Sequence, residues 1–437
     1  MNTPLDDNSV EVAVLRKVSR RLIPFIFLLF VLNILDRANV GFARLQMLEE
    51  LHLSEEVFGF GGSIFFIGYF LFQVPSNLIL NRIGARLWIA GIVVAWGLIS
   101  TSMMFIRDAW SFYVLRFLLG IAESGFFPGM ILYLTYWIPA RERAQAVASF
   151  MTASAIAGMI GGPLSGALMQ FLDGTAGLSG WQWMFLMEGL PTVILGFVVF
   201  FWLTDRPEVA GWLTDAERDW LSNRMRSEQT QRMQQHGFTL WMTLCHPKVW
   251  LLSCLYFVLA MGANGFSLYL PELVRGKFPE SGKLQIGLLS AIPYALAVVC
   301  MILSSIHSDR TGERRWHVAV PAFLAAVGWG LSGYCNNPWL VLGSLSLAAI
   351  GMYSTFAPFW SLPNSFLSGA AAAGGIALIN SVGNLGGFAA PMLISKVKAA
   401  TNSFAGGLFV MALVFCISVC LVLCVRHERA WEKVEPS

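Results

Sequence analysis

Residues 81–88 read Asn-Arg-Ile-Gly-Ala-Arg-Leu-Trp, and residues 309–316 read Asp-Arg-Thr-Gly-Glu-Arg-Arg-Trp. The two stretches lie 228 residues apart and share Arg, Gly, Arg and Trp at the same four places. An apolar segment precedes each copy at the same offset. We therefore expect a chain of two similar halves, related by an approximate twofold axis, with a cavity between them.

The composition is typical of a membrane protein. Of the 437 residues, 56% are hydrophobic and only 13% are charged, whereas soluble domains carry about 25% charged residues. Apolar runs of about 20 residues, long enough to cross a bilayer, recur along nearly the whole chain. We predict twelve transmembrane helices, near residues 22–47, 54–80, 86–105, 110–137, 145–171, 182–203, 250–274, 284–307, 317–334, 338–361, 370–395 and 402–425.

The longest polar interval, 204–248, separates two sets of six predicted spans. We predict an all-α integral membrane fold with two pseudo-symmetric six-helix bundles. Within the interval, Thr214 and Glu217 have the spacing of a capping box, which predicts a helix that runs toward Met233. The predicted parts are an N-terminal tail at 1–21, an N-terminal bundle at 22–203, a partly helical linker at 204–248, a C-terminal bundle at 249–425 and a C-terminal tail at 426–437.

The basic residues are distributed unevenly between alternate loops. If the N-terminus is cytoplasmic, the cytoplasmic segments hold 20 of the 29 Lys and Arg residues and the opposite side holds 7. The positive-inside rule then places both termini in the cytoplasm. We expect a multi-pass protein of the cell (inner) membrane that is surrounded by lipid, works as a monomer and binds no nucleic acid.

The sequence lacks the motifs of common enzyme, metal and nucleotide sites. Its seven cysteines show no CxxC spacing, and its six histidines are scattered with no HExxH string. No G-x-x-x-x-G-K-[ST] string of an ATP-binding loop occurs. We expect no enzyme activity, no cofactor and no metal site.

Four charged residues are predicted to lie inside the membrane. Asp36 and Arg37 are in the middle of the first predicted span. Arg116 and Glu123 share one face of the fourth, about two turns apart. A charge near the bilayer centre costs about 3 kcal/mol on insertion scales, so such residues are functional candidates. The alternative is that they form structural ion pairs that only hold helices together.

These residue types suit an anion and a proton. A guanidinium keeps its charge and binds a carboxylate through two hydrogen bonds, so the arginines are predicted to bind an anionic substrate. Burial favours the protonated form of a carboxyl group, whereas a nearby arginine favours the charged form. A substrate that occupies the arginine would free the acid to take a proton, which couples anion movement to proton movement.

Further polar residues on the predicted spans are candidates for substrate contact. Bonding to a neighbouring helix is the alternative for each of them, and anchoring at the membrane interface is the alternative for the tryptophan. The candidates are Tyr69, Gln73, Ser154, Asn264, Trp360, Asn380 and Asn384.

Glycines and basic loops form two other groups. The string GMIGGPLSG is predicted to bend a helix and to let backbones approach closely, either for plain packing or for the conformational cycle. The helix-bend residues are Gly158, Gly162, Pro163 and Gly166. The repeated loops could hold one state closed by pairing with acids or with helix C-termini. Their residues are Arg82, Gly84, Arg86, Asp309, Arg310, Gly312 and Arg314.

These motifs resemble those of the major facilitator superfamily along nearly the whole chain. DRTGERR at 309–315 resembles its loop motif D-R-x-G-R-R, and GMIGGPLSG at 158–166 resembles its fifth-helix motif G-x-x-x-G-P-x-x-G. The first loop copy departs, because Asn81 stands where the motif has Asp.

Three strings resemble the anion:cation symporter family, which carries sugar acids, tartrate, phthalate and other carboxylates. They are NILDRANVGFA at 33–43, RFLLGIAESGFFPG at 116–129 and YWIPARERA at 136–144. The linker at 203–221 resembles the branch with tartrate, phthalate and hydroxyphenylacetate carriers. Ser154 stands where some sugar-acid carriers have a larger amide.

The resemblance implies a role for each residue of the expected site. Asp36 and Glu123 would be protonatable coupling acids, and Arg37 and Arg116 would meet the substrate carboxylate. Two more residues, Tyr69 and Asn380, would line the central site, the latter near Trp360. We therefore expect proton-coupled symport of a small organic anion by alternating access. The alternatives are an anion exchanger on the same fold and a membrane sensor that does not transport.

Overall fold

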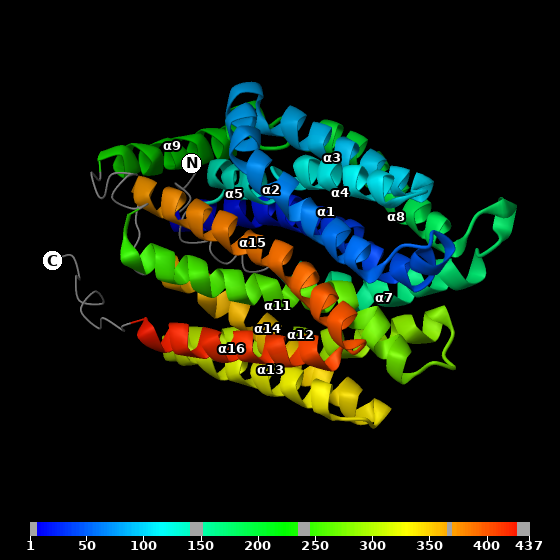
Figure 1. Ribbon diagram of the computed structural model, residues 1–437. Helices are drawn as coiled ribbons and strands as arrows, with labels where there is room; N and C mark the ends of the chain where they lie inside the picture. The colour runs from blue at the N-terminus through cyan, green and yellow to red at the C-terminus, as the bar shows by residue number, and fades with distance from the viewer. Residues whose placement is uncertain (1–6, 140–151, 235–244, 365–368, 426–437) are drawn as a thin grey trace.

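The computed structural model describes residues 7–139, 152–234, 245–364 and 369–425. Long helices run side by side in two groups, one from each half of the sequence (Figure 1). The N-terminal half holds α1 (Asp7–Glu50), α2 (Glu55–Ile83), α3 (Ala85–Ser102), α4 (Ala109–Glu123), α5 (Phe126–Trp137), α7 (Ala153–Phe171) and α8 (Gly180–Trp202). The linker helix is α9 (Asp215–Gln234). The C-terminal half holds α11 (Pro247–Lys277), α12 (Lys283–Thr311), α13 (Trp316–Tyr334), α14 (Pro338–Asn364), α15 (Gly369–Thr401) and α16 (Ala405–Cys424).

The predicted all-α membrane fold is confirmed. In the described residues, 11 helices are long and apolar enough to cross a membrane. They correspond to all the predicted spans except the fifth, near 145–171. That span is occupied by α7 from Ala153 onward, and its first residues lie outside the described ranges. The first helix begins at Asp7, so it extends through the predicted boundary at residue 21.

The fourth predicted span is one membrane crossing made of two helices. It breaks between α4 and α5, at Ser124 and Gly125. Pro128 has no amide hydrogen for the Ser124 carbonyl, and its ring crowds that carbonyl, so a continuous helix is unfavourable here. A Cβ on Gly125 would lie 1.7 Å from the Ser76 hydroxyl. The break therefore comes directly after Glu123, one of the four predicted intramembrane charges.

Each of the repeated loops turns at a glycine with a positive φ angle. Gly84, between α2 and α3, has φ +93°, and Gly312, between α12 and α13, has φ +68°. A residue with a side chain is disfavoured at these angles, which explains why glycine recurs at the matched position. In the second copy, Arg314 donates to Asp309 at 2.6 Å. In the first copy, Asp205 accepts from the backbone amide of Arg86 at 2.8 Å.

The linker carries the predicted helix. Glu217 accepts from the Thr214 amide at 2.8 Å, and the Thr214 hydroxyl accepts from the Glu217 amide at 3.3 Å, so the predicted capping box is confirmed. Lys17 near the start of α1 pairs with Glu217 at 2.7 Å. Figure 1 shows the end of α16 at the same end of the molecule as α9. We call this the linker end, and the other the opposite end.

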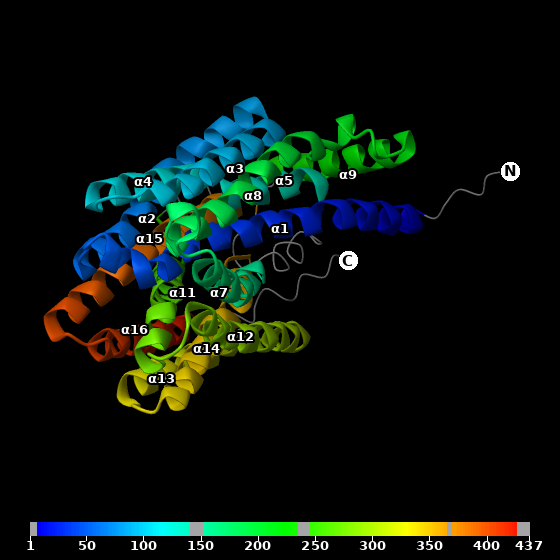
Figure 2. The same ribbon diagram turned by 90° about the vertical axis from the view of Figure 1, so that its right-hand side faces the viewer.

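Two helix pairs join the halves across the approximate twofold axis, α7 with α12 and α2 with α15, as Figure 2 shows from the side. Backbones touch where α7 crosses α12, because a Cβ on Gly287 would lie 2.2 Å from the Gly162 carbonyl oxygen. A Cβ on Gly166 would lie 2.4 Å from the Lys283 carbonyl oxygen. The predicted close approach at the glycine string is therefore confirmed as helix packing between the halves.

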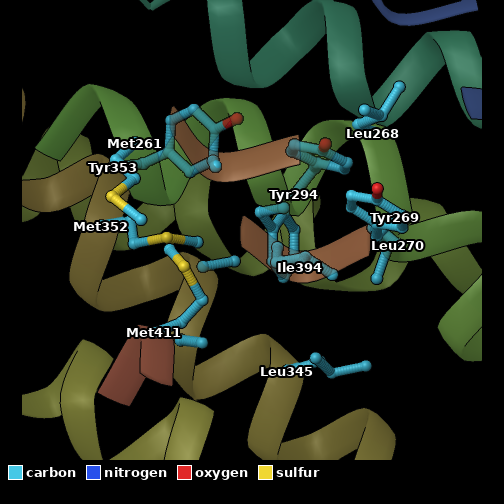
Figure 3. Packing of buried hydrophobic residues seen from close by; sticks show 14 of the residues in the cluster. Met261, Leu268, Tyr269, Leu270, Tyr294, Leu345, Met352, Tyr353, Ile394 and Met411 are labelled. Carbon is cyan, nitrogen blue, oxygen red and sulfur yellow. The ribbon is translucent and has the colours of Figure 1, made fainter. Parts of the chain in front are cut away.

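Apolar packing also joins the halves near the opposite end. Phe58 of α2 meets Tyr269 of α11 edge-on, with ring centroids 6.2 Å apart. Both belong to a buried cluster that continues through the C-terminal half, part of which is shown in Figure 3. There Met352 and Met411 lie close to each other. Such burial contributes about 25 cal/mol per Å² of apolar surface.

Ion pairs close the opposite end between the two halves. Arg44 of α1 pairs with Glu55 of α2 and with Glu272 of α11. Lys398 of α15 pairs with the same two acids, at 2.6 Å from Glu55. The four residues alternate in sign and come from both halves, so each charge has two opposite neighbours. We call them the opposite-end charge cluster.

Another ion pair joins the halves nearby. Asp173, in the loop after α7, pairs with Lys283 of α12 at 2.9 Å. Partial burial opposes its charge, but hydrogen bonds from Gln46, Lys283 and the Gly180 amide lower the pKa of Asp173 to about 2. A lowered pKa means that the stabilisation is fully present above the ordinary value of 3.8 and is lost as the pH falls toward about 2. The pair thus persists throughout the physiological pH range.

Replacing Gly287 with Ala tests the backbone contact between α7 and α12. The added methyl group meets a backbone carbonyl that cannot turn away, so we expect Gly287→Ala to destabilise the protein by about 1–3 kcal/mol. Thermal unfolding of the purified protein in detergent measures the change. Gly343→Ala is the matched control, since a Cβ there meets nothing within 4 Å and alanine favours a helix. Equal unfolding temperatures for the two variants would contradict this packing.

Candidate functional site

A cavity of about 140 Å³ lies between the two halves. Its walls come from α1, α2, α4, α5 and α7 on one side and from α11, α14 and α15 on the other. Its polar lining residues are Asn33, Arg37, Tyr69, Arg116, Ser154, Tyr256, Asn264, Ser267, Tyr353, Asn380 and Asn384. Both cationic lining residues belong to the N-terminal half, whereas the C-terminal half supplies amides and hydroxyls.

Arg37 and Glu123 form a buried ion pair at the cavity wall. The Nε and Nη2 atoms of Arg37 donate to the same Oε2 of Glu123, at 3.1 and 2.8 Å. The amide of Asn33, one turn before Arg37 on α1, donates to that oxygen at 2.9 Å. The other oxygen of Glu123, Oε1, is buried without a hydrogen-bond partner in the described residues. Glu123 therefore keeps one carboxylate oxygen that can still accept a hydrogen bond.

Among the described residues, no acid pairs with Arg116 in this way. Its Nε atom donates weakly to the Gly61 carbonyl at 3.3 Å, and its Nη1 atom is buried without a partner in the described part of the chain. The ring of Phe65 lies 4.9 Å from the guanidinium of Arg116 and 5.0 Å from that of Arg37. One aromatic ring thus contacts both guanidinium groups at one wall of the cavity. A guanidinium with an unused donor, only 2% exposed, is a ready binding group for an anion.

Asp36 is separated from the other three predicted charges. Neighbouring residues on a helix point about 100° apart, so Asp36 faces the inside of the N-terminal half while Arg37 faces the cavity. Its carboxylate accepts from Trp96 at 2.9 Å, and from Ser100 and Thr192 at 2.8 Å each. Asp36 is 1% exposed and does not line the cavity. The structure brings together three of the four charges and places the fourth behind them.

Of the other predicted contact residues, five line the cavity and two do not. The five are Tyr69, Ser154, Asn264, Asn380 and Asn384. Gln73 and Trp360 do not line it; Trp360 packs against Tyr256, a lining residue, with ring centroids 4.9 Å apart. Asn384 donates to the carbonyl of Asn380 at 2.8 Å, one turn away on α15.

Sequence reasoning missed several residues of the site. Asn33, Tyr256 and Tyr353 line the cavity. The sequence alone does not show whether a single polar residue in an apolar span faces a cavity or a neighbouring helix. Glu188 is different, because it is an acid in the middle of the sixth predicted span. The insertion cost that singled out Asp36 and Glu123 applies equally to Glu188 and could have identified it.

The loop residues predicted to act in gating lie away from the cavity. Arg82 and Arg310 are exposed at the linker end, and Arg314 pairs locally with Asp309. Their gating role remains a prediction. Among the residues described, no group of three or more His, Cys, Asp or Glu side chains is arranged to hold a metal ion.

Two helical bundles of like design, a cavity between them and buried cations at its wall define a membrane carrier that works by exposing one site to each side in turn. The sequence profile described as Major Facilitator Superfamily matches residues 26–391. The chain belongs to this superfamily, as the loop and glycine motifs predicted. It is a multi-pass membrane transporter and not an enzyme.

Several known proteins are similar to this chain along nearly its whole length. A protein named "Putative tartrate transporter" from Agrobacterium vitis is 48% identical over 421 residues, covering 96% of this chain and 93% of its own. The "Quinolone resistance transporter" of Acinetobacter baumannii is 40% identical, covering 97% of this chain and 98% of its own. Inner membrane transport protein RhmT of Escherichia coli (strain K12) is 37% identical, covering 95% and 96%.

Solved structures of low sequence identity share the fold. A bacterial homologue of the human lysosomal transporter Spinster, in an inward-facing and occupied conformation, matches with a TM-score of 0.75 at 14% identity, covering 92% of this chain and 95% of that one. The xylose transporter XylE from E. coli, in a partially occluded inward-open conformation, matches with a TM-score of 0.71 at 17% identity, covering 93% and 98%.

The ion pair at the cavity wall predicts unequal effects of single and double substitutions. Arg37→Ala leaves Glu123 buried without its main partner, so we expect a loss of about 3–5 kcal/mol in unfolding free energy at neutral pH. Adding Glu123→Gln to that variant removes the uncompensated charge and should recover much of the loss. Denaturation of the purified single and double variants measures the coupling.

Lys17→Ala is the control for this cycle. It breaks the partly exposed pair with Glu217, for which we expect a loss of less than about 1 kcal/mol. Additive losses for Arg37→Ala and Glu123→Gln would show that the two side chains do not act as a pair.

Proposed function

We propose that this transporter moves a small organic acid together with protons. The proposal rests on one observation: the two arginines that line the cavity differ in how many of their hydrogen-bond donors are already used. Arg116 has an unused donor for a carboxylate, and Arg37 has donors already shared with the acid Glu123. An anion that binds Arg116 and reaches Arg37 competes with Glu123 for the second guanidinium. Anion binding and the charge of Glu123 are then linked.

The coupling follows from this competition. When the substrate carboxylate takes the donors of Arg37, Glu123 loses the partner that favours its charged form. A carboxyl group in a water-poor wall without a partner is more stable with a proton than without one. The substrate therefore recruits a proton, and neither crosses efficiently without the other. Asp36, beside Arg37 on α1, is the second proposed coupling acid.

The size of the cavity favours a compact substrate. Engineered cavities of about 150 Å³ bind benzene, and this one has about 140 Å³. A four-carbon hydroxy dicarboxylate such as tartrate fits this volume better than a bulky aromatic acid does. Two cations would meet its two carboxylates, and amides such as Asn264 and Asn380 would bond its hydroxyl groups. The printed name of the relative from Agrobacterium vitis supports this substrate class.

We further propose that the protein lies in the cell membrane with both termini in the cytoplasm. The uneven distribution of Lys and Arg supports this orientation. The opposite end, with its charge cluster, would then face outward, and the structure would represent a state that is closed to the outside. We propose a single chain as the working unit, since the cavity is formed within one chain.

Removal of Arg116 tests the substrate site. We expect Arg116→Ala to lose tartrate uptake into proteoliposomes almost completely and to lose the thermal stabilisation that tartrate gives the purified protein. The carboxylate loses its one uncommitted cationic partner, while the cavity wall loses no ion pair. Circular dichroism should show an unchanged helix content.

Arg107→Ala is the matched control, because this arginine is exposed in a loop at the opposite end. It should transport at the wild-type rate. Normal uptake by Arg116→Ala would refute the substrate site. A thermal-shift series with sugar acids, phthalate and hydroxyphenylacetate tells which acid is preferred.

Neutral replacements of the two acids test the coupling. We expect Glu123→Gln and Asp36→Asn to exchange labelled tartrate for unlabelled tartrate across the membrane but to lose accumulation driven by a pH gradient. Each variant keeps the shape of the side chain and removes a proton site. Exchange and accumulation are measured in the same proteoliposomes.

Undiminished accumulation by both variants would count against proton coupling at these acids. If the wild-type protein exchanges tartrate rapidly and shows no accumulation in a pH gradient, it is an exchanger rather than a symporter. Binding without any movement would instead indicate a sensor.

A further inference from the structure

A third intramembrane acid lies behind the cavity. Glu188 of α8 is 4% exposed and points into the N-terminal half. Its Oε1 atom accepts from the Ser165 hydroxyl of α7 at 2.7 Å. Its Oε2 atom is buried without a hydrogen-bond partner in the described residues. One hydroxyl at hydrogen-bond distance, with the amide of Asn39 nearby, is modest compensation for a carboxylate buried in the membrane.

The charged neighbour of Glu188 is another acid. Helix α8 packs against α1, α3, α7 and the short helix η1 (Met103–Phe105). Of these, α1 presents Asp36, whereas α3 and α7 present the uncharged groups Ser100 and Ser165. In the described residues, hydrogen bonds to Asp36 and Glu188 come from uncharged side chains only. Two negative charges side by side without a cation are costly in a membrane, and a shared proton removes one of them.

Thr192 binds the carboxylate of Asp36 and lies one turn after Glu188 on the same helix. Its hydroxyl donates to Asp36 at 2.8 Å and lies 3.5 Å from the carbonyl oxygen of Glu188, one turn before it on α8. Asn39, one turn after Asp36 on α1, adjoins Glu188. Both amide atoms of Asn39 are buried without a hydrogen-bond partner among the residues described. A chain of polar groups thus runs from Asp36 past Glu188 to Asn39.

This chain ends at a second cavity in the seam between the halves. The cavity has a volume of about 20 Å³ and is lined by Asn39, Ser165 and Gly162 on one side and by Ser290 and Tyr294 of α12 on the other. A space of this size holds one water molecule when polar groups surround it. The backbone contact between Gly162 and Gly287 seals the seam in this state. Separation of α7 from α12 would open the cavity.

We propose that Glu188 is a further proton-binding residue of the transport cycle, loaded through the seam between α7 and α12 and sharing its proton with Asp36. The proposal rests on the proposed function, because it assumes proton-coupled transport. It also explains why Asp36 points away from the cavity: there it can share a proton with Glu188. In the cycle, the seam opens when the opposite end opens, Glu188 takes a proton from that side, and closure retains it.

The test is the proton count of Glu188→Gln in proteoliposomes. Glutamine keeps a hydrogen bond to Ser165 but cannot carry a proton. Each coupled proton multiplies accumulation about tenfold per unit of pH gradient. We expect Glu188→Gln to accumulate tartrate about tenfold less per unit of gradient than wild type, with one proton fewer per substrate and unchanged exchange. Glu188→Asp should restore part of the accumulation.

Glu280→Gln is the matched control, since this acid is exposed in a loop at the opposite end and its replacement should alter nothing. If Glu188→Gln does not fold, Ser165→Ala provides the second measurement. Loss of that hydroxyl should shift the pH dependence of accumulation and leave exchange intact. A purely structural role would leave the proton count and the pH profile unchanged.

The outcomes separate the two proposals. If wild type accumulates in a pH gradient and Glu188→Gln or Ser165→Ala equals it, Glu188 carries no coupled proton and this inference is overturned, whereas the proposed function stands. If wild type shows no proton-driven accumulation, the proposed function itself fails, and this inference fails with it.

Discussion

The ion pair between Arg37 and Glu123 joins α1 to α4 at the wall of the central cavity, and the site depends on it. Glu123 is fully buried and Arg37 is mostly buried, so the buried acid depends on the arginine beside it. The pair leaves one acid oxygen unsatisfied, and it stands next to a second guanidinium, that of Arg116, with a donor unused. In the proposed mechanism an anion that enters this pair changes which partner each charge has, so the pair acts as a switch.

Pairs of opposite charges also hold the opposite end of the molecule, but they are arranged differently from the pair at the cavity. In the opposite-end charge cluster, two basic and two acidic side chains from both halves satisfy one another, and the backbones of α7 and α12 touch nearby. Arg44 is buried and the other three members of the cluster are only partly exposed, so salt screens these contacts less than it screens pairs at an open surface. The central charges stay within one half, whereas two of the four ion pairs in the cluster cross between the halves.

Much of this arrangement could be predicted. The loop repeat at 81–88 and 309–316 indicated two alike halves, and matching positive φ angles at Gly84 and Gly312 explain why the repeat exists. The capping box of α9 was readable from Thr214 and Glu217. Other features were not: the break after Glu123 depends on Pro128 together with the crowding of Gly125 by Ser76 of α2. That second contact is distant in sequence, and no local pattern reports it.

The sequence by itself determined that the protein is a two-part membrane transporter, and it singled out Asp36, Arg37, Arg116 and Glu123 as candidates, because a charge in the middle of an apolar span is costly. Only the tertiary structure decided what each charge faces. Asp36 and Arg37 are adjacent in the chain, yet a helix turns about 100° between them and sends one toward Glu188 and the other toward the cavity. Direction is set by the packing of helices from distant parts of the chain, and this information is absent from any single span.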